Sequence, residues 1–347
     1  MGFAQDSTGT TGGSKGEFEV FPIVSYDTDT GFGYGLKFFA LNYLERDESV
    51  DLVLFNSTKG ERWYRLVFSI PDFERRQGTV YDWAVDLTVD YDKWISYSFF
   101  GVGNTSSYED RETYTRIPFE LSVMVSRGFS TRSVGQLGLR YVTVLNRNFS
   151  EGSQLVALPP PENASRATLL SLAGTFRYDS RDSYVNPTRG AVVQAEGEVA
   201  PRTGFSNVAF TRVGGWIQLY HEVFAPKLVL AGRVGMQTLS GSNIPVQMLM
   251  PIGGNKTVRG SVQDRYLDMV SIVSNLELRF PIVWRFGGLI GVDAGKVWHS
   301  VRQIDLARWA TNPVIGLRFF MDTFLVRLDV GFGRETTGFY LNFGQIF

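Results

Sequence analysis

Apolar and polar residues alternate, segment after segment, from Glu17 to the C-terminus. In residues 191–199, apolar or small side chains take the odd positions, whereas Gln194, Glu196 and Glu198 share the opposite face. Successive side chains of a β-strand point to opposite faces of the sheet. This period of two therefore predicts strands with one apolar and one polar face.

Sixteen such segments follow one another, separated by stretches rich in the turn-forming residues Gly, Pro, Asn and Asp. Residues 146–165 are predicted to be a polar loop, because consecutive prolines cannot lie inside a sheet. Residues 1–16 are rich in Gly, Ser and Thr, and we expect them to be disordered. The predicted strands cover residues 19–26, 31–44, 50–56, 62–70, 80–91, 112–129, 134–145, 168–178, 191–199, 207–224, 227–239, 270–280, 286–294, 312–321, 325–334 and 337–346.

The same pattern predicts how the chain would meet a membrane. Its 347 residues are 44% hydrophobic and 14% aromatic, yet no run approaches the roughly 18 uninterrupted apolar residues of a membrane-spanning helix. Strands that cross a membrane must close on themselves, because lipid offers no hydrogen-bond partner to an unpaired strand edge. We therefore predict an all-β fold, a sixteen-stranded antiparallel transmembrane β-barrel over residues 17–347.

Composition excludes several classes of function. The absence of cysteine rules out a disulfide framework and thiolate metal sites, and we predict no metal or cofactor. A formal net charge of −1 leaves no basic footprint for nucleic acid. The two histidines, His221 and His299, lie in separate segments, and the sequence has no G-x-S-x-G elbow of a serine hydrolase. The sequence therefore favours a protein that is not an enzyme.

Candidate chemistry concentrates near residues 251–296. A glycine-rich loop there contains Val258, Arg259 and Gly260, and two predicted strands follow it. Alternation places Glu277 on the polar face of the first strand and Asp293 on the polar face of the second. An arginine in a loop thus precedes two carboxylates on neighbouring strands.

The G-G…V-R-G loop, the L-E-L-R-F-P strand and the D-x-G strand resemble the bacterial surface antigen or outer-membrane assembly-factor superfamily, which includes BamA, TamA and the two-partner-secretion transporters. The resemblance implies that the loop folds into the barrel between the eleventh and twelfth strands. It also implies that Arg259 pairs with Glu277 and Asp293 on the wall, as a latch. Relatives usually carry periplasmic POTRA domains ahead of the barrel, and residues 1–16 are too few to form one.

The resemblance further implies a protein of the Gram-negative outer membrane that inserts or translocates other proteins, or lipid. Its partners would be membrane lipid, lipopolysaccharide, client outer-membrane proteins and, during its own biogenesis, the barrel-assembly machinery. A soft seam between residues 19–26 and 337–346 could open to template a client strand. Two alternatives stay open: a passive pore, and the translocator barrel of a patatin-type phospholipase whose enzyme domain would precede residue 1.

Two other stretches resemble features of the same superfamily. In the turn Y-D-S-R-D-S-Y-V-N-P-T-R-G, Asp and Asn side chains are expected to cap the backbone, Pro187 to set the turn and Gly190 to allow positive φ. We interpret this turn as structural, with the residues Asp179, Arg181, Asp182, Pro187 and Gly190. The last predicted strand ends in phenylalanine and looks like the sorting signal of outer-membrane barrels, carried by Phe339, Leu341, Phe343 and Phe347.

Overall fold

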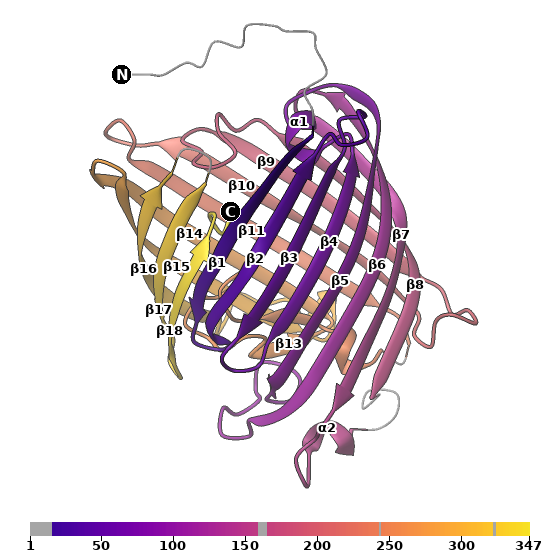
Figure 1. Ribbon diagram of the computed structural model, residues 1–347. Coiled ribbons are helices and arrows are strands. Elements are labelled where there is room, and N and C mark those ends of the chain that lie inside the picture. Colours follow the sequence, from indigo (N-terminus) through magenta and orange to yellow (C-terminus); the bar gives the residue numbers. More distant parts are fainter. Residues whose placement is uncertain (1–15, 159–164, 243, 322–323) are drawn as a thin grey trace, which may run out of the picture.

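The computed structural model describes residues 16–158, 165–242, 244–321 and 324–347. Within these residues, sixteen antiparallel strands close into a barrel (Figure 1). The prediction of a sixteen-stranded antiparallel barrel is confirmed. Residues 1–15 of the segment expected to be disordered, and the prolines of the 146–165 loop, lie outside the described residues.

Each barrel strand pairs with its neighbours in the chain, and β1 pairs with β18 to close the cylinder. The short strands β12 and β13 form a separate two-stranded sheet, so β11 pairs directly with β14. The strands are β1 (Glu17–Asp27), β2 (Gly31–Leu41), β3 (Ser49–Ser57), β4 (Arg62–Ile70), β5 (Tyr81–Phe99), β6 (Glu112–Ser130), β7 (Ser133–Arg147), β8 (Arg166–Asp179), β9 (Gly190–Ala200), β10 (Phe210–Glu222), β11 (Val229–Ser240), β12 (Met250–Ile252), β13 (Tyr266–Asp268), β14 (Val270–Val283), β15 (Phe286–Trp298), β16 (Ala310–Phe320), β17 (Leu325–Phe332) and β18 (Thr337–Phe343).

Helical structure is confined to single turns in the connections. These are α1 (Phe73–Arg76), α2 (Gln154–Ala157), η1 (Val246–Met248) and η2 (Val301–Gln303). Among the residues that the structure describes, no helix is long and apolar enough to cross a membrane.

The period of two in the sequence separates the outer and inner faces of the barrel. On β9, Val193 and Val199 are 44% and 48% exposed, whereas Glu198 between them is 6% exposed. On β14, Leu276 is exposed and its neighbour Glu277 is fully buried. The apolar face is therefore the outer one, and the polar face lines the interior.

The two ends of the barrel differ. The end called here the terminal end carries the start of β1, the end of β18 and the connection with α1. The opposite end, the loop end, carries α2 and the long connection between β11 and β14 (Figure 1). Long connections at the loop end reach the interior, where they form the candidate site.

Several strand ends differ from the prediction by a few residues; β15, for example, continues to Trp298 instead of ending at residue 294. Two of the differences have a clear physical reason. β5 continues to Phe99 instead of ending at residue 91, because its last aromatic side chains pack against the β11–β14 connection; Tyr97 and Phe99 are 6% and 1% exposed. β18 ends at Phe343, three residues early, because Gly344 adopts a φ of +76° and leaves the extended conformation. The first difference arises from contacts between residues far apart in the sequence, and the second begins at a single glycine.

Candidate functional site

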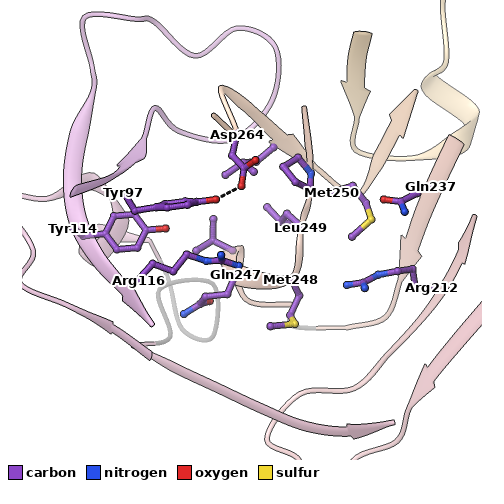
Figure 2. A pocket seen from close by; sticks show the side chains of 13 residues that line it. Tyr97, Tyr114, Arg116, Arg212, Gln237, Gln247, Met248, Leu249, Met250 and Asp264 are labelled. Atoms are coloured by element: carbon purple, nitrogen blue, oxygen red, sulfur yellow. Dashed lines mark hydrogen bonds between the residues drawn. The ribbon is translucent and has the colours of Figure 1, made fainter. Parts of the chain in front are cut away.

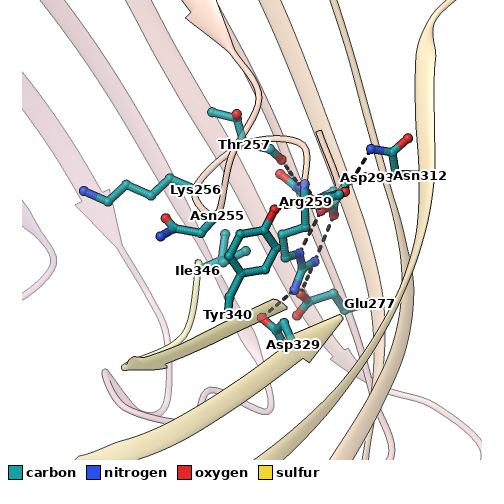
Figure 3. A network of polar contacts seen from close by, with 12 residues as sticks. Asn255, Lys256, Thr257, Arg259, Glu277, Asp293, Asn312, Asp329, Tyr340 and Ile346 are labelled. Carbon is teal, nitrogen blue, oxygen red and sulfur yellow. Dashed lines mark hydrogen bonds and ion pairs between the residues drawn. The ribbon is translucent and has the colours of Figure 1, made fainter. Parts of the chain in front are cut away.

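The candidate site is the contact between the barrel wall and the connection of residues 241–269, called here the long loop. Its central residue, Arg259, is fully buried. The wall residues that it contacts alternate with exposed apolar residues such as Leu276 and Ile290. The contact therefore lies on the inner face of the wall (Figure 3).

Arg259 contacts carboxylates from three strands. Its Nε donates to Asp293 at 2.7 Å, and its Nη2 donates to Glu277 at 2.7 Å and to Asp293 at 2.9 Å. Its Nη1 donates to Asp329 on β17 at 3.0 Å. The side chains of Glu277, Asp293 and Asp329 are all 0% exposed. The structure thus brings together the three residues singled out from the sequence and adds a fourth, Asp329.

The guanidinium of Arg259 stays positively charged. Burial alone would lower the pKa of Arg259, but Asp293, Glu277 and Asp329 outweigh burial and hold that pKa well above its usual value. A guanidinium presents its donors in a planar fork, which lysine cannot reproduce. Arg259 therefore serves as a fixed cation shared by β14, β15 and β17.

Glycine is required on both sides of this contact. Gly260 has a φ of +92°, and a Cβ there would lie 2.6 Å from the backbone carbon of Gly331 on β17. Conversely, a Cβ on Gly331 would lie 2.4 Å from the backbone carbon of Arg259. The two backbones approach too closely for any side chain, which explains Gly260 beside the arginine. Val258, the residue before Arg259, is 1% exposed.

The long loop also contacts both strands of the barrel closure. The Gly260 N–H donates to the Tyr340 hydroxyl on β18 at 3.0 Å. The Asn255 side chain donates to Asp27 at the end of β1, and the Gln263 N–H donates to Asp29 just beyond it at 2.8 Å. One loop therefore bridges the first and last strands at the loop end.

The direct pairing of β1 with β18, called here the seam, is short. It consists of two residue pairs, Tyr26 with Leu341 and Asp27 with Tyr340. By comparison, β1 and β2 share eleven pairs, and β17 and β18 share seven. Most of the β1 edge that faces β18 is therefore unpaired.

Pro22 removes one donor from this edge. The Thr28 N–H donates to the Phe339 carbonyl across the seam at 3.2 Å. Because the direction of backbone groups alternates along a strand, the nitrogens of Tyr26 and Pro22 face the same side. Proline carries no N–H. Continuing the seam register would place Gln345 opposite this gap in the ladder.

The chain leaves the seam at Gly344 and its last residue enters the interior. Phe347 is 6% exposed, packs against Tyr220 and lies beneath the guanidiniums of Arg233 and Arg279, 5.2 and 4.9 Å from its ring. Phe347 therefore lies apart from the strand predicted to carry it. The other residues proposed for the sorting strand remain on β18: Phe339, Leu341 and Phe343.

The long loop leaves a cavity of about 220 Å³ on the opposite side, toward β5, β6, β10 and β11 (Figure 2). Arg116 and Arg212 approach it from opposite walls. The Tyr97 hydroxyl donates to Asp264 of the loop, and burial raises the pKa of that carboxyl. The loop thus has one side bound to the wall by ion pairs and another side that borders open space.

The turn between β8 and β9 lies at the terminal end, away from this site. Asp179 accepts hydrogen bonds from the backbone and the side chain of Arg181, and Asp182 accepts from two backbone N–H groups later in the turn. Pro187 is buried. Gly190 has a φ of +109°, and a Cβ there would lie 2.4 Å from a carbonyl oxygen across the turn.

Sequence reasoning missed several members of the site. Asp329, Tyr340 and Asn312, whose side chain donates to the Arg259 carbonyl at 2.9 Å, all come from strands after the recognised motif. A signal for Asp329 was present, because alternation in β17 places it on one face with Arg327 and Gly331. Within the described ranges, no group of three or more metal-ligand side chains is arranged to hold a metal ion.

The fold and this site define a class: closed sixteen-stranded membrane barrels with a buried arginine in a long loop. A family model, the Omp85 superfamily domain, matches residues 42–347, and the chain belongs to this superfamily. The match confirms the resemblance to the outer-membrane assembly factors. Barrels of the BamA type in this superfamily are not enzymes. Among curated protein sequences, none matches the chain.

Solved structures share the fold at low identity. BamA from Haemophilus ducreyi lacking POTRA domains 1–3 is 16% identical with a TM-score of 0.69, over 95% of this chain and 70% of that one. CdiB from Acinetobacter baumannii is 14% identical with a TM-score of 0.58, over 94% and 60% of the two chains. CdiB from Escherichia coli is 12% identical with a TM-score of 0.64, over 93% and 62%. The chain thus spans about three fifths of the CdiB chains.

Proposed function

We propose that the protein is a Gram-negative outer-membrane barrel that inserts or translocates client polypeptides by opening between β1 and β18. Membership of the Omp85 superfamily supports this function, and so does the fold shared with BamA and CdiB. The observation that carries the proposal is the seam, which closes with only two residue pairs. Its partners would be membrane lipid, lipopolysaccharide, client barrels and the assembly machinery that folds it.

The unpaired part of β1 suits recognition by strand addition. A strand edge presents a row of N–H and C=O groups, and an extended client segment can pair with them. In a bilayer those groups have no water to bind, so an unpaired edge is costly and an incoming strand is favoured. The client strand would add to β1 on the side that β18 leaves open.

In this mechanism the Arg259 cluster holds the long loop, and the loop holds the seam. Loop contacts to Tyr340 on one side and to Asp27 and Asp29 on the other connect the two seam strands. Separating β18 from β1 would break these contacts as well as the two ladder pairs. The loop therefore sets how readily the barrel opens.

Engineered disulfides test the seam, because the chain has no cysteine of its own. Tyr26→Cys with Leu341→Cys joins two paired residues of β1 and β18, and paired Cα atoms about 4.5–5.5 Å apart suit a disulfide. The assay measures how fast a second outer-membrane barrel folds into liposomes that contain this protein. We expect oxidation to abolish the acceleration and reduction to restore it.

A matched control crosses a fully paired ladder. Val193→Cys with Ile217→Cys joins paired, outward-facing residues of β9 and β10, and its oxidation is expected to leave the folding rate unchanged. The proposal is wrong if the wild-type protein gives no acceleration over protein-free liposomes. It is also wrong if the oxidised seam variant works as well as the reduced one.

A further inference from the structure

A second pocket, of about 420 Å³, lies at the terminal end, far along the barrel from the long loop. Its roof is the β4–β5 connection with α1, and its sides are the β6–β7 and β8–β9 turns. Its floor is formed by the inner faces of β7, β8 and β9, including Gln136, Thr175 and Gln194. Ligand pockets in proteins usually fall between about 300 and 1,000 Å³, so this one is large enough for a small organic molecule.

The lining of this pocket carries an excess of positive charge. Four guanidiniums face it, from Arg76, Arg132, Arg177 and Arg181, and Asp179 is the carboxylate among its lining residues. Asp179 is shared by two of them, since it accepts from Arg177 at 2.8 Å and from Arg181 at 2.8 Å.

Two other acids near the pocket do not cancel the excess. Asp86 pairs with Arg76, which leaves four guanidiniums against two carboxylates. Asp182 in the adjacent turn is bound by its own turn, accepting from Thr188 and from the Arg189 N–H. The pocket therefore attracts anions.

Two arginines of the pocket carry donors that have no acceptor among the described residues. Arg132 is exposed, and its side chain makes no hydrogen bond or ion pair with any described residue. The Nε of Arg177 is buried and also lacks a partner among the described residues. A buried donor without an acceptor costs free energy, and an oxyanion in the pocket would relieve that cost.

Two aromatic rings flank these donors. Phe73 and Tyr184 are 51% and 46% exposed, so part of each ring is free to contact a ligand. Each ring is held by an arginine: Arg76 lies 5.4 Å from the Phe73 ring and Arg181 lies 5.4 Å from the Tyr184 ring. Planar guanidiniums and fixed rings together suit a ligand with both an anionic group and a flat apolar part.

We propose that this pocket binds a small organic oxyanion, a carboxylate or phosphate attached to a planar apolar group. The anionic group would lie among Arg132, Arg177 and Arg181, and the apolar part would lie against Tyr184 and Phe73. This site does not depend on strand exchange at the seam, and it would be occupied with the barrel closed.

Calorimetric titration of the full chain in detergent micelles tests the site. The probes are phenyl phosphate, benzoate, inorganic phosphate and uncharged phenol. We expect saturable binding with phenyl phosphate tightest and phenol undetectable. Arg132→Gln should weaken phenyl phosphate about fivefold, the scale of one lost charge-assisted hydrogen bond, and Arg132→Glu should weaken it further. Both variants should fold, because this side chain is exposed and unpaired.

The matched control is Arg127→Gln, on the same end of β6 but outside the pocket, where it pairs with Asp82 on the exposed surface. It should bind phenyl phosphate as the wild type does. Loss of binding in this control to the same degree as in Arg132→Gln would show a diffuse surface-charge effect and overturn the proposal. Absence of saturable binding, or phenol binding as tightly as phenyl phosphate, would overturn it as well.

Discussion

The Arg259 cluster joins the long loop to β14, β15 and β17, whereas the seam joins β1 to β18, and the two contacts are built in opposite ways. The cluster is dry, and one guanidinium contacts three fully buried carboxylates from three strands. The seam has two ladder pairs and an edge that runs unpaired toward the terminal end. At the loop end, the contacts of the long loop with Tyr340, Asp27 and Asp29 therefore add to a ladder of only two pairs.

In this arrangement the resistance to opening would come from the contacts of the long loop rather than from the length of the β1–β18 ladder. A long ladder between β1 and β18 would resist opening along its whole length, as the eleven pairs between β1 and β2 do. A short ladder supported by the long loop concentrates resistance in a few contacts around Tyr340, Asp27 and Asp29. Changes in the loop should therefore alter opening more than changes in the outer face of the seam.

The largest expected effect on the free energy of unfolding comes from Arg259→Ala, which removes the buried cation of the Arg259 cluster. Three buried carboxylates lose their shared cation, and removing one partner of a buried ion pair typically costs about 3–5 kcal/mol. Urea unfolding in lipid bilayers should show a loss of this size. Arg127→Ala breaks an exposed pair and should cost about 0–1 kcal/mol. Equal losses in the two variants would mean that the cluster adds no more than a surface pair.

A smaller effect is expected from Gly331→Val, which pushes the loop off the wall without changing charge. The added Cβ would lie 2.4 Å from the Arg259 backbone, and overpacking of this kind costs about 1–3 kcal/mol. Gly197→Val on β9 is the matched control, because a Cβ there meets nothing within 4 Å. Seam opening, measured as the folding rate of a client barrel, should rise only for Gly331→Val. A rise in neither variant would uncouple the loop from the seam.

The smallest effect concerns pH and the loop's contact with the end of β1. Burial, with help from nearby Asp27, raises the pKa of Asp29 to about 7 from its ordinary value of 3.8. The folded protein therefore holds this proton more tightly than the unfolded chain does. The resulting stability is fully present below about pH 4 and is lost as pH rises through about 7. Asp29→Asn should flatten the pH dependence of unfolding in that range, and an unchanged profile would contradict this assignment.

The fold could be predicted from the sequence because every strand of a barrel wall follows the same local pattern. Each strand must be apolar outside and polar inside, and alternation such as that of residues 191–199 records this rule directly. The pairing of Arg259 with Glu277 and Asp293 was expected from the resemblance of this stretch to the superfamily, since alternation alone places the two carboxylates only on the polar faces of neighbouring strands.

The features of the site and the fold that could not be predicted depend on contacts between distant residues, which alternation does not encode. Asp329 joins the cluster through β17, which is adjacent to neither β14 nor β15 in the sheet. The inward turn at Gly344 and the extension of β5 to Phe99 depend on what fills the interior. A pattern of period two states which face a side chain occupies but not which distant residue meets it there.

Pro22 on the unpaired edge of β1 affects any strand that adds to this edge. A strand that adds to β1 finds no donor at Pro22, so the carbonyl placed opposite must remain unsatisfied or bend away, at a cost of several kcal/mol in hydrocarbon. An added strand is thus expected to form a continuous ladder only with residues 23–27 of β1 and to pair more weakly beyond them. A ladder this short should release the added strand readily, which repeated insertion or translocation of clients, as proposed above, would require.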